Sequence, residues 1–285
     1  RTIIALPGVP IEMKKLTDEE IIPYLLKKFP AQKCKKSCII KVTGIGESTV
    51  NEHIKDFIHQ NNHLNIGIYA NPEDIHIQIN ALAASFKEAT GILDKATKTI
   101  QKLLGQKIYG YDHQSLEQVI GEMLRKRKWH LAVAESCTGG MLGAIITRVP
   151  GSSDYFKGGI ISYDAEIKEK RLGVSPKTIQ KYGQVSPEVA AAMAQGVRNQ
   201  CHADIGIGIT GIAGPGGGTP DKPVGLVYMS LADGHETIVR KHLLRKDRET
   251  IRLRAARRAL NMLRLYLLNK TSINDVNGKR QNNPA

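Results

Sequence analysis

The stretch Leu131-Ala132-Val133-Ala134-Glu135-Ser136-Cys137-Thr138-Gly139-Gly140 decides the fold of the larger part of this chain. Its first four residues are apolar and form a run short enough for a buried strand, and its two glycines come just before a segment with helical spacing. In an α/β sheet, a strand that passes directly into a helix presents its polar side chains at the carboxyl edge of the sheet. We therefore expect a ligand site at residues 136–140.

Strands and helices alternate on both sides of this stretch. We predict helices over residues 116–127, 138–148, 187–201 and 248–269, and strands over residues 129–134, 158–163, 204–210, 226–232 and 237–244. The last two strands flank Asp233-Gly234, a hairpin signal, so we expect one antiparallel pair late in the order. This pattern predicts an α/β fold over residues 110–270, a three-layer α/β/α domain with a mixed sheet.

A smaller α+β domain is predicted over residues 17–109. It has strands at 37–43, 64–70 and 74–81 and helices at 47–60 and 85–104, with a turn at 71–74. Residues 105–113, which hold two glycines and two tyrosines, are the predicted linker. The capping-box pattern Thr17-x-x-Glu20 predicts a helix from residue 17 to 28, kinked at Pro23. We further expect a strand at 3–6 and a frayed polar tail at 271–285.

Composition limits the classes of function. Lys and Arg number 41 against 27 Asp and Glu, and the net charge of +14 favours phosphorylated or other anionic partners. One Trp and four Phe offer few rings for stacking on single-stranded nucleic acid. Without a signal peptide or an apolar stretch of about 20 residues, we expect a cytoplasmic protein that does not enter the membrane. We expect the four cysteines to be reduced, and no metal, because Cys34-x-x-x-Cys38 lacks a second pair of ligands. We also expect no cofactor.

The local pattern leaves two interpretations of Ser136 open, a helix cap and a nucleophile. The two glycines favour a nucleophile, because they let a substrate approach the main chain, where the N–H groups of Cys137 to Gly139 would stabilise an oxyanion. Tyr163 and Lys168, five residues apart after the next strand, are the predicted activating groups. A partly buried lysine beside a phenol can have its pKa lowered enough to accept a proton.

The third predicted strand ends in a glycine-rich loop that begins at Thr210-Gly211 and reaches Gly218. The spacing Gly206-x-Gly208-x-x-Gly211 matches a dinucleotide fingerprint in letters only, because these glycines lie inside the predicted strand and no helix follows. We expect a flexible cover over a small anionic ligand, with Thr210 and Gly211 as hydrogen-bond donors at its base.

Three ordered motifs together resemble the C-terminal domain of the CinA family, the competence/damage-inducible proteins. They are residues 134–140, then Gly158-Gly159-Ile160-Ile161-Ser162-Tyr163 with Lys168, and then residues 211–218 with Lys222-Pro223-Val224-Gly225. Upstream, residues 17–109 are similar to the family's KH-like middle domain. Residues 6–14 are similar to the end of its molybdopterin-binding-like domain. We therefore expect residues 1–16 to be a remnant of that domain and the chain to be a fragment.

The resemblance implies hydrolysis of the carboxamide of nicotinamide mononucleotide to nicotinate mononucleotide and ammonia, a reaction of NAD salvage. It implies Ser136 as the nucleophile and Tyr163 and Lys168 as its activating partners. The residues expected to contact this small phosphorylated nucleotide are Cys137, Thr138, Gly139, Gly159, Thr210, Gly211, Gly214, Arg248 and Arg252. The alternative is a non-catalytic nucleotide-binding or regulatory protein linked to competence or DNA damage. We also expect a homo-oligomer.

Three departures from the family pattern limit what the resemblance implies. The family's metal-dependent ADP-ribose pyrophosphatase activity belongs to the missing domain and is not expected here. Gly44-Ile45-Gly46-Glu47 stands where a nucleic-acid-binding KH module has a Gly-x-x-Gly turn, so we expect no nucleic acid to bind there. The family's Tyr-Ser-Asn-Glu-Ala-Lys is Tyr163-Asp164-Ala165-Glu166-Ile167-Lys168, which keeps the tyrosine–lysine spacing and loses the asparagine.

Overall fold

The computed structural model describes residues 2–29, 33–71 and 74–278, and the chain forms two compact units. The first consists of residues 1–38, 54–67 and 78–103, and the second of residues 39–53, 68–77 and 104–285. Within the described ranges, no helix combines the length and the hydropathy that a bilayer crossing requires. Those ranges also hold no group of three or more His, Cys, Asp or Glu side chains arranged to bind a metal ion.

The N-terminal segment is helical from residue 10 to 28, so the helix predicted from residue 17 begins earlier than expected. Helix α1 (Pro10–Leu16), one π-helical turn (Thr17–Ile21) and α2 (Ile22–Lys28) follow one another without a break, and residues 3–6 form no strand. The hydroxyl of Thr17 donates to the Met13 carbonyl (2.7 Å), so this residue lies inside the helical run and is not its cap. Pro10 stands in the first turn of the run, where the missing N–H breaks no hydrogen bond. Pro23 lies inside the run, directly after the π-helical turn.

The KH-like region follows the predicted order. It contains β1 (Cys34–Val42), α3 (Glu47–Gln60), β2 (Asn65–Ala70), β3 (Ile75–Ala83) and α4 (Phe86–Leu104), and its sheet has the order β2-β3-β1-β4. The predicted turn at 71–74 lies partly outside the described residues. The prediction of a linker at residues 105–113 is wrong. This segment contains a 3₁₀ turn (Gly105–Lys107) and β4 (Ile108–Tyr111), and β4 pairs antiparallel with β1. The guanidinium of Arg264 fixes this segment by donating to the carbonyls of Gln106 (2.6 Å) and Ile108 (3.3 Å).

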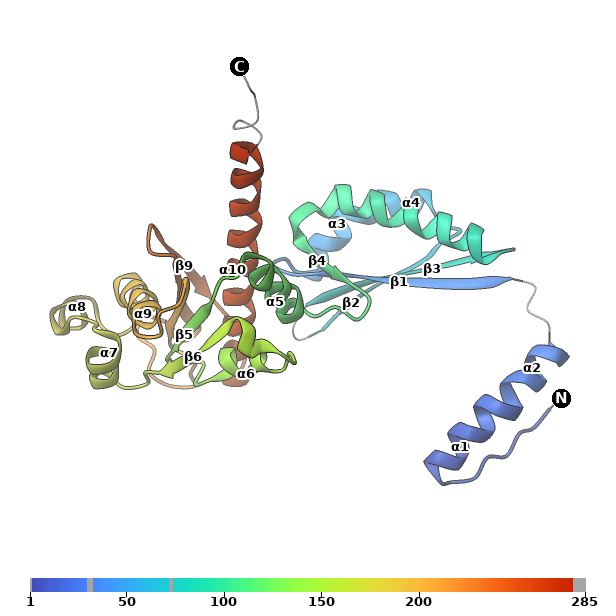
Figure 1. The fold of residues 1–285 in the computed structure, drawn as a ribbon, viewed down its shortest axis with the longest axis horizontal. Coiled ribbons are helices and arrows are strands. Elements are labelled where there is room, and N and C mark those ends of the chain that lie inside the picture. Colours follow the sequence, from blue (N-terminus) through green and yellow to red (C-terminus); the bar gives the residue numbers. More distant parts are fainter. Residues whose placement is uncertain (1, 30–32, 72–73, 279–285) are drawn as a thin grey trace, which may run out of the picture. The chain divides into compact units, whose positions relative to one another are not determined.

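The C-terminal domain is the predicted three-layer α/β/α arrangement (Figure 1). Its helices are α5 (Leu116–Arg127), α6 (Met141–Thr147), α7 (Ala165–Leu172), α8 (Pro176–Tyr182), α9 (Pro187–Gln200) and α10 (Arg248–Gly278). Its strands are β5 (Leu131–Glu135), β6 (Phe156–Ile161), β7 (Ile205–Gly211), β8 (Leu226–Ala232) and β9 (Thr237–Leu243). The sheet order is β6-β5-β7-β8-β9. Strands β6, β5 and β7 are parallel to one another, β8 pairs antiparallel with β7, and β9 pairs antiparallel with β8.

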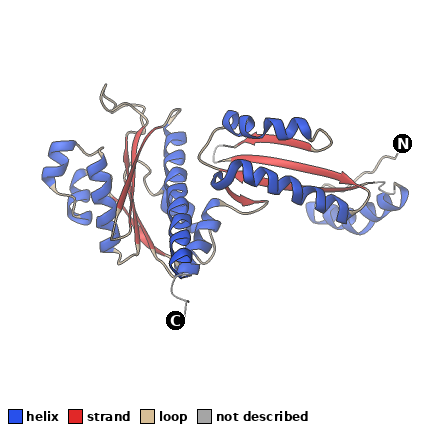
Figure 2. Ribbon diagram, turned by 90° about the horizontal axis from the view of Figure 1, so that it is seen from above, coloured by secondary structure: helices blue, strands red, loops and turns tan. Residues whose placement is uncertain are grey.

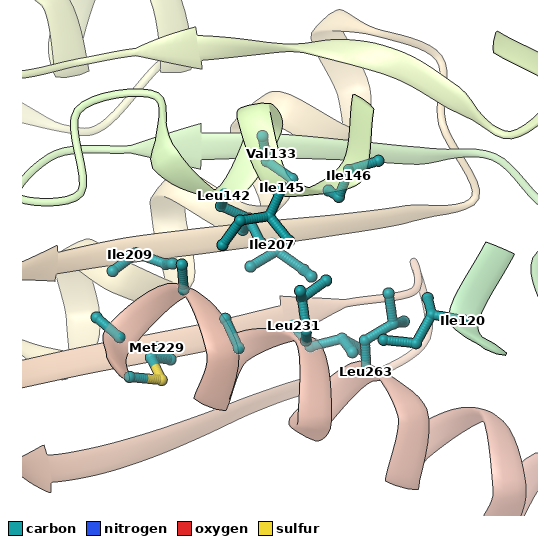
Figure 3. Close-up of a cluster of buried hydrophobic side chains, with 14 of the residues drawn as sticks. Ile120, Val133, Leu142, Ile145, Ile146, Ile207, Ile209, Met229, Leu231 and Leu263 are labelled. Atoms are coloured by element: carbon teal, nitrogen blue, oxygen red, sulfur yellow. The ribbon is translucent and has the colours of Figure 1, made fainter. Parts of the chain in front are cut away.

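Helices cover both faces of this five-stranded sheet (Figure 2). On one face, side chains of β5, β7 and β8 pack against α5, α6 and α10, where Leu263 lies beside Leu231 and Ile120 (Figure 3). On the other face, Ala132 and Ala134 pack against residues of α7 and α9. Burial on both faces explains the continuous apolar runs that the sequence shows in β5 and β7.

Helix α10 is longer than predicted and continues through Gly278, so residues 271–278 are helical where we expected a frayed tail. Extending an existing helix adds one hydrogen bond for each residue fixed, which favours propagation into a polar segment.

Candidate functional site

Three polar residues form a row at the carboxyl edge of the C-terminal sheet. In the strand register, Glu135 is level with Ile161 of β6 and Ile209 of β7, so the residues that follow, Ser136, Ser162 and Thr210, are level with one another. Two backbone hydrogen bonds continue this register, from Ser136 N to Ile209 O (3.0 Å) and from Ser162 N to Glu135 O (2.8 Å). Because neighbouring strands lie about 4.8 Å apart, the three backbones are close neighbours.

Glu135 prepares the turn that carries Ser136. Its carboxylate, only 2% exposed, accepts hydrogen bonds from the N–H groups of Gly140 (3.1 Å), Leu142 (3.0 Å) and Gly143 (2.8 Å). A buried carboxylate is stabilised there by the free amides and the positive end of α6. The Glu135 side chain therefore caps the N-terminus of α6, a role that we did not predict.

The predicted oxyanion donors need one correction. The N–H of Gly139 already donates to the Ser136 carbonyl (3.0 Å), so it does not point into the site. No hydrogen bond from the N–H groups of Cys137 and Thr138 to another described residue is present, and these two remain as donors. Gly139 and Gly140 have φ values of +57° and +92°, a conformation that glycine adopts without strain. The glycines thus shape the loop that presents the two free amides.

Two buried side chains stand beside Ser136. Burial raises the pKa of the Cys137 thiol to about 12, so the sulfur stays protonated at neutral pH and is a poor nucleophile. The Thr138 side chain is fully buried, and its hydroxyl has no hydrogen-bond partner among the described residues. An unpaired buried hydroxyl costs free energy, and a ligand atom that bonded to it would recover that cost.

Lys168 lies on α7, whose N-terminus is capped by the Asp164 side chain. Its side chain is fully buried, and its amine donates to the carbonyls of Ser162 (2.8 Å) and Tyr163 (3.1 Å) and to Gln184 Oε1 (3.2 Å). Burial lowers the pKa of this amine, and the charge of Asp164 partly opposes the shift. The contacts described for the amine are with oxygens of the main chain and of Gln184, and none is with Ser136 Oγ.

Gln184 joins two parts of the site and was not predicted. Its side-chain oxygen accepts from Lys168, and its carbonyl accepts from the hydroxyl of Thr210 (2.8 Å). It follows Gly183, whose φ of +75° ends α8. Because we did not predict α8, we could not place the start of the next segment at the sheet edge.

Tyr163 and two arginines form the outer rim of the site. The phenol, 58% exposed, accepts from Arg248 Nη2 (2.9 Å), and Arg248 Nη1 donates to the Gly214 carbonyl (2.6 Å). Arg252 Nη2 donates to the Thr138 carbonyl (2.8 Å). Of the two predicted activating groups, the phenol of Tyr163 therefore contacts Arg248, while the amine of Lys168 contacts the carbonyl of Tyr163 and not its phenol.

Three predicted glycines have packing reasons for being glycine. A Cβ on Gly159, in the middle of β6, would lie 2.8 Å from a side-chain carbon of Val133, and one on Gly211 would lie 2.7 Å from the Leu226 carbonyl. Gly214 has a φ of +79°, a left-handed conformation. The contribution of these glycines to substrate binding remains a prediction.

Comparison with known proteins identifies both parts of the chain. The profile of the CinA C-terminal domain matches residues 113–267, and that of the damage-inducible protein CinA KH domain matches residues 37–110. A putative competence-damage inducible protein of Moorella thermoacetica is 44% identical over 258 residues, which are 90% of this chain and 62% of that protein. One from Clostridium kluyveri is 41% identical over 94% of this chain and 65% of its own length.

Solved structures match the C-terminal part. The competence/damage inducible protein CihA from Agrobacterium tumefaciens has 34% sequence identity and a TM-score of 0.52, and the match covers 53% of this chain and 93% of that one. A CinA superfamily protein from Escherichia coli gives 31% identity and a TM-score of 0.51 over 53% of this chain and 90% of its own. The chain spans less than two thirds of the length of the curated relatives named above. Its sequence and its C-terminal fold show that the chain belongs to the CinA family.

Proposed function

We propose that the strand-end site hydrolyses the carboxamide of nicotinamide mononucleotide, with Ser136 as the nucleophile. The observation that carries this proposal is the row of Ser136, Ser162 and Thr210 beside a buried lysine. Side chains alternate along a strand, so Ser136, two residues after Ala134, continues the face that packs on α7 and α9. Lys168 and Gln184 belong to this same side of the sheet.

The chemistry follows from these positions. Ser136 Oγ attacks the carboxamide carbon while its proton passes to the neutral amine of Lys168, whose lowered pKa makes that form accessible. To accept the proton of Ser136, the Lys168 amine gives up one of its longer hydrogen bonds, either to Gln184 (3.2 Å) or to the Asp164 carbonyl (3.5 Å). The free N–H groups of Cys137 and Thr138 bind the oxyanion. The ammonium of Lys168 then protonates the amide nitrogen, the C–N bond breaks to release ammonia, and an acyl ester remains on Ser136. Water hydrolyses this ester to the nicotinate product and restores the serine hydroxyl.

The rim supplies the charge that a mononucleotide requires. Arg248 and Arg252 lie on the first two turns of α10, and each already binds a carbonyl of the loops around Ser136. Guanidinium groups bind phosphate through paired hydrogen bonds, and their position fixes the nucleotide relative to the nucleophile.

The test is to incubate the purified protein with nicotinamide mononucleotide and measure ammonia and nicotinate mononucleotide. We expect equal amounts of both products. Calorimetric binding of the nucleotide with no product over hours would contradict the hydrolysis and support the regulatory alternative.

A further inference from the structure

A second candidate site lies within the second compact unit, and none of the residues that line it belongs to the strand-end site. It is a cavity of about 880 Å³, a volume typical of small-molecule sites. Its walls are formed by β9, by α10, by the loop 43–47 that precedes α3, and by residues near the start of β3.

Five arginines line this cavity, and we call four of them the arginine cluster: Arg240, Arg245, Arg254 and Arg258. The fifth, Arg257, is paired with Asp74 and Glu117. Arg254 and Arg258 are four residues apart on α10 and so share one face of the helix. Among the described residues, no carboxylate pairs with a member of the cluster. Three acids also belong to the cavity wall. Asp74 pairs with Arg257 (3.7 Å) and Glu236 with Lys270 (3.2 Å), two cations of the same wall, and Glu47 is the third acid.

The members of the arginine cluster act on one another and on His242. The pKa of Arg258 is lowered by burial and then by the charge of Arg254. The pKa of His242 is lowered by burial and then by the charges of Arg258 and Arg240. Arg240, Arg245 and Arg258 remain exposed to solvent and Arg254 is half-buried, so an anion can reach all four. Like charges gathered around one cavity are a recognised sign of a binding site for the opposite charge.

The rest of the cavity wall is suited to a flat organic ring. Its apolar members include Ile45, Ile75, Ile238, Leu244, Met262 and Leu265. Asn261 adds a hydrogen-bond donor, because its Oδ1 accepts from Arg264 and its Nδ2 lies 3.0 Å from where a Cβ on Gly44 would stand. The cavity therefore combines a concentrated positive charge with an apolar surface and one amide.

We propose that this cavity binds a nucleoside diphosphate or triphosphate, with its phosphates on the arginine cluster and its base against the apolar wall. Such a ligand carries about three to four negative charges at neutral pH, which matches the four guanidinium groups. A nucleic-acid strand fits less well, because the acidic Glu47, the first residue of α3, stands at the turn with which a KH module clamps the backbone. The proposal is independent of the chemistry at Ser136.

The test is calorimetric titration of the 285-residue chain with ATP, ADP and inorganic pyrophosphate at low salt. The double variant Arg254→Gln/Arg258→Gln should weaken binding of ATP and pyrophosphate at least about tenfold. Arg171→Gln removes an exposed arginine of α7 and should leave binding unchanged. Arg252→Gln changes the strand-end rim and should also leave it unchanged, which separates the two sites.

Thermal unfolding serves as the control for correct folding of the double variant. Because the substitutions remove two like charges from one site, its melting temperature should be equal to or higher than that of the unmodified chain. Three results would overturn the proposal. They are no binding of ATP, ADP or pyrophosphate by the unmodified chain, equal binding by the double variant, and tighter binding of a single-stranded oligonucleotide than of ATP.

Discussion

The chemistry of the strand-end site depends most on one buried amine. Lys168 is fully buried and surrounded by carbonyl and amide oxygens, which suit an ammonium, yet the proposed reaction needs the neutral amine. Burial moves the pKa in the direction that the reaction requires. The residue can therefore be tested separately as a charge, a hydrogen-bond donor and a base.

Replacing Lys168 with Met should reduce ammonia release by about 100- to 10 000-fold, the usual contribution of a positioned base. Lys168→Arg keeps the charge and the donors but cannot be deprotonated, and it should be as inactive as the Met variant. Steady-state assays check both, with circular dichroism as the control for folding. Turnover by the Arg variant near that of the unmodified protein would contradict a role as base.

The lowered pKa of Lys168 also predicts a pH dependence of stability. Between that pKa and the ordinary value of 10.5, the unfolded chain binds more protons than the folded one, so this lysine contributes more stability as pH rises. Urea unfolding at several pH values should show the unmodified protein gaining stability relative to Lys168→Met as pH increases. A relative loss with rising pH would show that the pKa is raised.

Gln184 should influence the pKa of Lys168, because its side-chain oxygen accepts a hydrogen bond from the lysine amine. Gln184→Leu removes an acceptor from the ammonium and should move the acidic limb of the rate profile to lower pH. Gln184→Glu adds a negative charge and should move the same limb to higher pH. The measurement is kcat against pH for both variants. Shifts in the same direction would indicate a purely structural role for Gln184.

At the scale of elements, Glu135 connects the end of β5 with the start of α6. Its buried carboxylate accepts three backbone N–H groups, so Glu135→Ala should destabilise the fold by about 2 to 3 kcal/mol and also lower activity. Glu135→Gln keeps the shape and should cost less. Urea unfolding measures both. A loss below about 0.5 kcal/mol for the Ala variant would contradict the capping role.

The close approach of β7 to α9 depends on glycine. A Cβ at Gly206 would lie 2.1 Å from the Ala194 carbonyl, so Gly206→Ala should destabilise the fold by about 3 kcal/mol. Gly216 has no atom within 4 Å of its missing Cβ, and Gly216→Ala is the matched control, expected to change stability by less than about 0.5 kcal/mol. Equal melting temperatures for the two variants would contradict this packing.

At the scale of the whole molecule, periodicity in the sequence predicted most elements. The bounds predicted for α3, α5 and β8 agree with the structure, because their apolar residues repeat with the period of a helix or face a buried layer. Strand β4 was missed because four residues carry little pattern and pair with β1, which lies far away along the chain. The N-terminal helix was misplaced because the box at Thr17 resembles a helix start.

The site was predictable where it depends on topology and not where it depends on distant side chains. Parallel strands bring their carboxyl ends to one edge, which placed Ser136, Tyr163 and Thr210 correctly at that edge. The contact of Tyr163 with Arg248 joins residues 85 positions apart, and no local pattern indicates it. The capping of α6 by Glu135 and the bridge through Gln184 likewise depend on tertiary packing.

The most direct test of the central claim is ammonia release from nicotinamide mononucleotide by the Ser136→Ala and Cys137→Ser variants, each shown to be folded. Because the buried thiol stays protonated at neutral pH, we expect Cys137→Ser to retain most of the activity of the unmodified protein. Ser136→Ala should lose at least about 1000-fold. Undiminished ammonia release by Ser136→Ala, or a loss of ammonia release in Cys137→Ser alone, would contradict a serine nucleophile.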